Sequence, residues 1–173
     1  MGIVNGLRRL VTVIAYAGFA LGGLSIMAMM VHIGADVILR TFFGHSLPGT
    51  LEITAHWYMV VTVFAPLALL QLNGDHVIVD IATHSMTPRG RALLNAFVGV
   101  LAVVLLYYWF SAAFELALRR TAQREYVEYG IEMLPVWPVR WIYVASIAAL
   151  LLAFCVTTIE NICIGAGYRR KTA

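Results

Sequence analysis

Four long apolar runs, none of which contains Asp, Glu, Lys or Arg, dominate the pattern of this chain. A helix needs about 20 apolar residues to cross the hydrocarbon core of a membrane, and these runs hold 26, 22, 23 and 19 residues. Only a helix satisfies its backbone polar groups over such a continuous stretch, and no run alternates as a barrel strand does. The runs are Leu10–Ala35, Ile53–Gly74, Ala92–Phe114 and Trp141–Ile159.

We therefore predict an all-α membrane protein with four transmembrane helices and short interfacial helical segments in the connections. Its 173 residues are 61% hydrophobic and only 12% charged, about half the charge of a soluble domain. No stretch outside the runs exceeds 26 residues, which is too short for a soluble domain, so one transmembrane domain over residues 1–173 is expected. The first run is too long for the core of a cleaved signal peptide and should remain as a span. The expected spans are residues 10–35, 52–73, 90–116 and 136–160.

Basic residues near the span ends predict which side of the membrane holds the termini. Four spans place both termini on one side, together with the second connection. That side has seven Lys or Arg residues, and the other side has five. Because cytoplasmic connections are enriched in Lys and Arg, both termini are expected in the cytoplasm. No basic face lies outside the membrane, so nucleic acid is not expected as a partner.

The first two helices contain a small-residue stripe and a proline. Gly18 and Gly22 are spaced i, i+4, with Ser25 one turn further, and such stripes let membrane helices approach each other closely. Two roles are open for this stripe, namely packing within the chain and contact with a partner subunit. Pro66 lies in the middle of the second run, where it is expected to kink the helix.

Charged residues gather at the ends of the runs and in the connections. Asp36 and Arg40 are spaced i, i+4 with the acid first, which is the favourable order for an ion pair on a helix. Arg124 and Glu128 have the same spacing in the third connection. We therefore expect the third helix to continue out of the membrane and to break before Pro135.

Three aromatic residues in the third run lie further from the ends of the run than the residues of an aromatic belt usually do. They are Tyr107, Tyr108 and Trp109, whereas Trp and Tyr usually gather at the two membrane interfaces. A long and tilted third helix is expected for this reason.

Few side chains within the spans are of the kinds that catalyse reactions or bind ions and substrates. Carriers usually hold ions and substrates with ionisable groups inside the membrane, and the four runs contain no charged residue. No phosphate-binding loop, nucleophile–base set or thiol-pair motif is present. We expect no enzymatic activity, no metal site and no cofactor. His32 and His56, near the same end of the first two helices, leave one alternative open, a haem held between them.

An ordered set of residues around the first two helices resembles one known family. Arg40 ends the first helix and is followed by Phe43-Gly44, Glu52 opens the second helix, and the run Gly74–Asp80 comes after it. This order resembles the motif pattern of the DctQ-like family. Its members are the small membrane subunits of tripartite ATP-independent periplasmic (TRAP) transporters. Members of that family share three features in this order. The first helix ends in an Arg near Phe-Gly, an acidic residue opens the second helix, and a Gly-x-His-(Ile/Val)-x-Val-(Asp/Glu) motif follows the second helix. The matching positions are Arg40, Glu52, His76 and Asp80.

The resemblance, which covers roughly residues 10–161, implies a role in transport. Family members are thought to act as a fixed scaffold beside a large polytopic subunit, which holds the substrate and sodium sites. A periplasmic binding protein delivers an organic acid, typically a carboxylate. The resemblance thus implies a multi-pass protein of the bacterial inner membrane, with the large subunit, the binding protein and membrane phospholipids as partners. The candidate structural or subunit-interface residues are Asp36, Arg40, Glu52, His76, Asp80, Gly18 and Gly22.

Two other functions remain open at this point. The first is a haem- or quinone-linked membrane anchor of a respiratory enzyme, in which His32 and His56 would hold the haem. The second is an assembly protein with no fixed transport partner.

Overall fold

Four membrane-length helices make up most of the fold. The computed structural model describes residues 2–73, 88–129 and 132–165. Within that part of the chain, four helical stretches are long and apolar enough to cross a membrane, and each expected span falls largely within one of them. The predicted all-α membrane fold is thereby confirmed. The stretches are Gly6–Phe43, Thr50–Asn73, Leu93–Ala122 and Trp137–Ile164.

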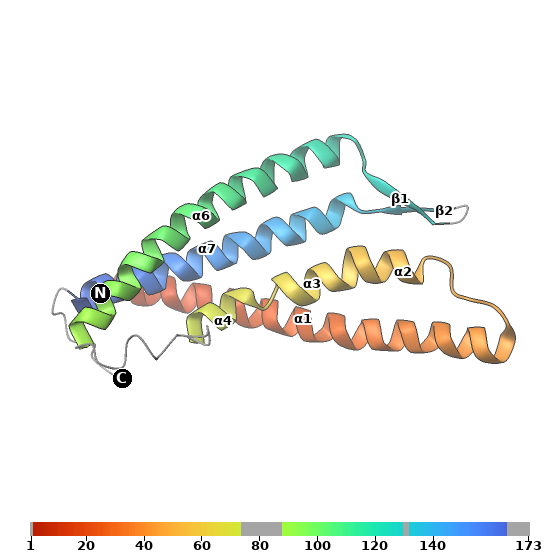
Figure 1. Cartoon of the computed structure of the whole chain (residues 1–173), viewed down its shortest axis with the longest axis horizontal. Helices are drawn as coiled ribbons and strands as arrows, with labels where there is room; N and C mark the ends of the chain where they lie inside the picture. Colours follow the sequence, from red (N-terminus) through yellow and green to blue (C-terminus); the bar gives the residue numbers. More distant parts are fainter. Residues whose placement is uncertain (1, 74–87, 130–131, 166–173) are drawn as a thin grey trace.

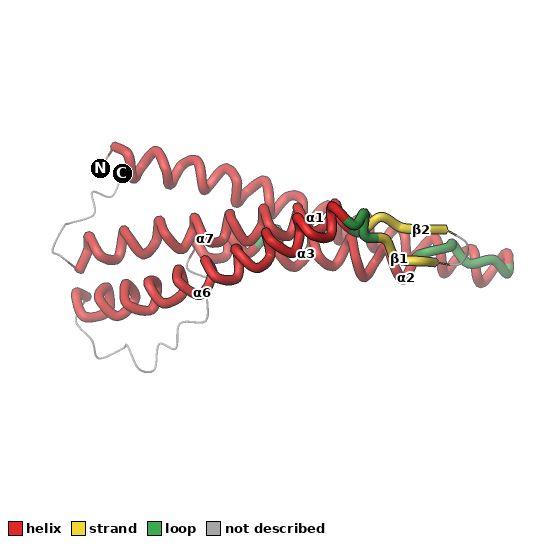
Figure 2. Tube along the Cα trace, turned by 90° about the horizontal axis from the view of Figure 1, so that it is seen from above, coloured by secondary structure: helices red, strands yellow, loops and turns green. Residues whose placement is uncertain are grey.

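The helices form two pairs that diverge from one end of the molecule (Figure 1). Helix α1 (Gly2–Phe43) lies beside the broken second helix, and α6 (Pro88–Ala122) lies beside α7 (Trp137–Gly165). Because α7 also contacts α1 and the second helix, it is the most buried of the four spans. The start of α1 and the end of α7 share one end of the molecule, here termed the terminal end (Figure 2). The opposite end is termed the hairpin end.

The second helix is interrupted where the sequence predicts a kink. Pro66 has no backbone N–H to donate, and the helix breaks at Ala65–Pro66. A π-helical turn lies nearer the hairpin end, and there the hydroxyl of Ser25 donates a hydrogen bond of 3.1 Å to the carbonyl oxygen of Tyr58. The segments in chain order are α2 (Thr50–Ile53), the π-helical turn Thr54–Tyr58, α3 (Met59–Phe64) and α4 (Leu67–Asn73).

The two glycines of the predicted stripe pack inside the chain, against this kink. A Cβ atom on Gly18 would lie closer than 3.0 Å to the carbonyl oxygen of Ala65. A Cβ atom on Gly22 would lie 3.2 Å from Cδ of Pro66. The stripe therefore lets α1 approach the backbone of the second helix at its break, which is an internal use of the small-residue pattern.

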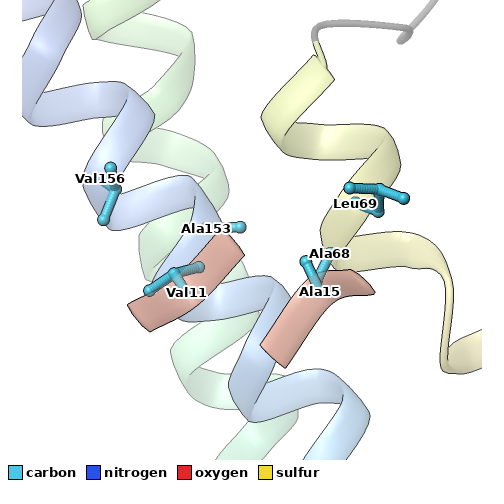
Figure 3. Packing of buried hydrophobic residues seen from close by; sticks show 6 residues of the cluster. All are labelled: Val11, Ala15, Ala68, Leu69, Ala153 and Val156. Carbon is cyan, nitrogen blue, oxygen red and sulfur yellow. The ribbon is translucent and has the colours of Figure 1, made fainter. Parts of the chain in front are cut away.

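Small apolar residues hold three helices together toward the terminal end. A buried cluster joins α1, α4 and α7 (Figure 3). Nearby, the amide of Gln71 donates a 3.0 Å hydrogen bond to the hydroxyl of Thr157. Arg8 and Glu160 form a 2.8 Å ion pair between α1 and α7. The terminal end is thus fixed by packing and by polar contacts together. The cluster residues are Val11, Ala15, Ala68, Leu69, Ala153 and Val156.

The third helix continues beyond its charge-free run to Ala122, as expected, but the third connection then forms a β-hairpin in place of further helix. Strands β1 (Tyr126–Tyr129) and β2 (Glu132–Pro135) pair antiparallel, with Tyr126 opposite Pro135. The expected helical pairing of Arg124 with Glu128 was wrong, because Arg124 has a left-handed φ of 47° and lies in the turn after α6. Aromatic and β-branched residues then favour a strand over Tyr126–Tyr129.

Candidate subunit interface

Asp36 fixes the connection between the first two helices at the hairpin end. Its side chain is 6% exposed, and its two carboxylate oxygens accept from different groups. Arg40 donates to one oxygen at 2.8 Å, and the backbone N–H of Leu47 donates to the other at 2.7 Å. The predicted pair of Asp36 and Arg40 therefore exists, and Asp36 also holds a backbone group eleven residues further along the chain.

The first and third connections contact each other at this end. Gly49, with a φ of 75°, lies directly under the ring of Tyr129, and a Cβ atom on Gly49 would lie 2.7 Å from that ring. The indole N–H of Trp57 donates a 3.3 Å hydrogen bond to the carbonyl oxygen of Pro135. These contacts join both helix pairs through their connections, so the hairpin end presents one continuous surface. We refer to residues 44–50 together with strands β1 and β2 as the hairpin-end surface.

Glu125 anchors the hairpin to the start of α7. Its carboxylate accepts two hydrogen bonds from the guanidinium of Arg140, one of them at 2.7 Å, and Arg120 lies 3.7 Å away. Its backbone carbonyl accepts from the N–H groups of Val136 and Trp137. The hydrogen bond from Arg140 lowers the pKa of Glu125 below its ordinary value, although partial burial acts in the opposite direction.

The lowered pKa of Glu125 gives a testable pH dependence. A carboxylate with a depressed pKa in the folded state adds stability above its unfolded pKa, and this stability is lost as the pH falls through the folded pKa. We expect Glu125→Gln to cost about 1–3 kcal/mol near neutral pH, because Arg140 loses a charged acceptor. The stability difference from the wild type should shrink as the pH falls through the lowered pKa of Glu125, because the carboxyl then becomes neutral.

Thermal unfolding in detergent at a series of pH values measures this difference. Glu128→Gln is the matched control, because Glu128 lies exposed on β1 three residues away. A constant difference at every pH would contradict the assignment of this ion pair.

The other sequence-predicted residues lie in different settings. Glu52 is half-buried in the first turn of α2. His76 and Asp80 lie outside the described residues. His32 lies against Tyr58, with its Nδ1 atom 3.4 Å from the tyrosine hydroxyl. Within the described ranges, no three His, Cys, Asp or Glu side chains lie close enough to hold a metal ion.

A family model for the DctQ component of tripartite ATP-independent periplasmic transporters matches residues 29–164. The chain belongs to this family. No curated protein and no solved structure gave a match. The matched DctQ region contains Asp36, Arg40 and Glu52 and starts after the two glycines of the α1 stripe.

Family membership confirms the resemblance drawn from the sequence. DctQ proteins are components of transporters, and the four apolar helices identify this one as a multi-pass membrane protein. Reasoning from the sequence found Asp36 and Arg40 but missed Glu125, Arg140 and Tyr129. Because these three act through contacts between distant segments, no local spacing could have indicated them.

Proposed function

We propose that this DctQ protein scaffolds the large membrane subunit of a TRAP transporter during uptake of an organic acid, a carboxylate, into a bacterial cell. The large subunit would use the sodium gradient, and a periplasmic binding protein would deliver the substrate. The family match over residues 29–164 is the observation on which this proposal mainly rests. We further propose that the protein lies in the inner membrane, with the hairpin end toward the periplasm and both termini in the cytoplasm, because the side that holds the termini has more Lys and Arg residues.

The distribution of charge supports a scaffolding role over a transporting one. The four apolar runs contain no Asp, Glu, Lys or Arg, whereas carriers usually bind ions and substrate with such groups inside the membrane. Charged pairs lie at the two ends of the bundle instead, as Arg8 with Glu160 and Asp36 with Arg40. These pairs hold helix ends in place, which suits a subunit that stays fixed while its partner moves.

The hairpin-end surface supports contact with the binding protein. The contacts of Gly49 with Tyr129 and of Trp57 with Pro135 hold the two connections beside each other. In the proposed orientation this surface faces the periplasm, where a binding protein would dock. A docking partner would therefore meet a pre-ordered surface, which lowers the entropic cost of binding.

Copurification provides the first test of the scaffold role. A tagged chain, purified in mild detergent from its native membrane, should retain one large polytopic subunit, which mass spectrometry identifies. Recovery of the chain alone, or with a soluble redox subunit and a haem spectrum, would contradict the proposal.

Arg40→Ala and Glu52→Ala should each reduce the amount of complex or the rate of uptake. Both residues lie next to the first connection, and Arg40 supports Asp36 there. Arg9→Ala is the matched control, because it removes an exposed arginine at the terminal end. The assay is uptake of labelled substrate into proteoliposomes that contain the complex. Unchanged complex and unchanged uptake in both variants would refute the assignment of these residues.

The energy source and the substrate class need a separate measurement. Uptake into the same proteoliposomes should require an inward sodium gradient and the binding protein. A panel of carboxylates should compete with the substrate, whereas neutral sugars should not. Uptake that continues after the sodium gradient is dissipated would exclude the sodium-driven mechanism.

A further inference from the structure

One face of α6 has no neighbour within the described chain. Its buried residues Gly99, Leu106 and Ala113 recur every seven positions and face α7, and α6 makes few contacts with other helices. At about 100° per residue, a second set lies on the opposite side of the helix. We term it the α6 outer face, and its members are Leu101, Leu105, Tyr108 and Ala112.

Tyr108 lies at the centre of this face and deep in the membrane. Together with Tyr107 it occupies the middle of the span Leu93–Ala122. It also lies six residues, about 9 Å along the helix, inside the charge-free run that ends at Phe114. Side chains on a helix lean toward its N-terminus, which for α6 is the terminal end. The hydroxyl of Tyr108 is thus directed further into the hydrocarbon and away from the nearer interface.

The hydroxyl groups of both tyrosines lack a hydrogen-bond partner within the described residues. The two rings meet edge to face, with centroids 6.0 Å apart, and Tyr108 is 68% exposed. The adjacent Trp109 differs, because its indole N–H donates a 2.6 Å hydrogen bond to the hydroxyl of Tyr143 on α7. Acyl chains offer no acceptor, so a tyrosine hydroxyl surrounded by lipid at this depth is costly.

We propose that the α6 outer face is a docking surface for a transmembrane helix of the large transport subunit, which supplies a hydrogen-bond acceptor to Tyr108. This inference rests on the proposed function, which provides the partner. Ala112 is small and one turn from Tyr108, so a helix can approach the α6 backbone closely next to the base of the Tyr108 side chain. The same side of α6 continues to the ion pair of Glu115 with Arg119 near the hairpin end, where a partner can make further polar contacts.

Site-specific photo-crosslinking within the native complex tests the surface. A benzophenone amino acid at position 105 or 108 should crosslink to the large subunit in intact membranes. The matched control is position 19, because Phe19 on α1 is also aromatic, apolar and exposed within a charge-free run. Position 19 should give at most a small fraction of that adduct. Adducts with lipid alone or with a second copy of this chain would overturn the proposal, as would crosslinking from position 19 instead.

A conservative substitution tests the hydrogen bond itself. Tyr108→Phe keeps the ring and removes only the hydroxyl, so the chain should fold as before. We expect the large subunit to dissociate about 3- to 10-fold more readily in detergent titration, as for the loss of one interhelical hydrogen bond in a membrane. Tyr16→Phe is the control, because Tyr16 is an exposed tyrosine on α1. If the Tyr108→Phe complex dissociates as the wild-type complex does, the proposed hydrogen bond is refuted.

The two proposals fail in different ways. If the wild-type chain copurifies with the large subunit but position 108 does not crosslink to it, only the docking face is wrong. If no large subunit accompanies the wild-type chain, the proposed function fails and the docking face fails with it.

Discussion

Gly18→Ala is expected to destabilise the protein by about 1–3 kcal/mol, the usual cost of overpacking a tight contact. The new methyl group would lie closer than 3.0 Å to the carbonyl oxygen of Ala65. A backbone oxygen cannot move aside as a flexible side chain does, so α1 must shift away from the second helix at its break. Thermal unfolding in mild detergent, followed by tryptophan fluorescence, measures the loss.

Gly23→Ala is the matched control for this change. Gly23 lies on the same helix, and a Cβ atom there would have no neighbour within 4 Å. Alanine also favours helix over glycine, so this control should be neutral or slightly stabilising. Gly22→Ala should lie between the two, because its closest contact would be 3.2 Å to the ring of Pro66. Equal unfolding temperatures for Gly18→Ala and Gly23→Ala would show that the helices do not approach this closely.

Asp36→Ala should loosen the first connection and cost about 2–4 kcal/mol, since hydrogen bonds to charged groups are among the strongest in proteins. The substitution leaves the N–H of Leu47 and the guanidinium of Arg40 without their acceptor. Without the Leu47 anchor, Gly49 should lose its position under Tyr129. Thermal unfolding reports the cost, and faster limited proteolysis between residues 41 and 50 reports the loosening.

Two further variants separate the contributions of the Asp36 carboxylate oxygens. Asp36→Asn keeps an oxygen that accepts from Leu47 but loses the charge that faces Arg40, so an intermediate effect is expected. Arg40→Ala should have the smallest effect, because the Arg40 side chain is 67% exposed and exposed ion pairs add little stability. If Arg40→Ala costs as much as Asp36→Ala, the anchoring of Leu47 is not the main role of Asp36.

Local patterns were sufficient to predict the spans, the kink and the charged end of α1. Each span follows from a continuous apolar run, and a helix is the structure that satisfies the backbone within such a run. Pro66 interrupts the second helix because it lacks an N–H, wherever that helix packs. Asp36 and Arg40 pair within one turn of one helix, so their spacing alone indicates the contact.

The third connection shows where a local pattern misleads. The spacing of Arg124 and Glu128 fits a helix, but an exposed i, i+4 pair contributes only a few tenths of a kcal/mol. The pairing of Glu125 with Arg140, together with the bonds of its carbonyl to Val136 and Trp137, favours the hairpin instead. Contacts with α7 therefore decide the conformation of this segment.

The sequence by itself determined that this is a four-span helical membrane protein, and its ordered motif indicated the DctQ family. Only the tertiary structure decided that the Gly18 stripe packs on the Pro66 break and that the first and third connections join through Gly49 and Tyr129. It also decided which face of α6 remains open around Tyr108. The physical reason is the range of the interactions. Membrane insertion and helix formation depend on neighbouring residues along the chain, whereas packing depends on segments that meet only after the helices have assembled.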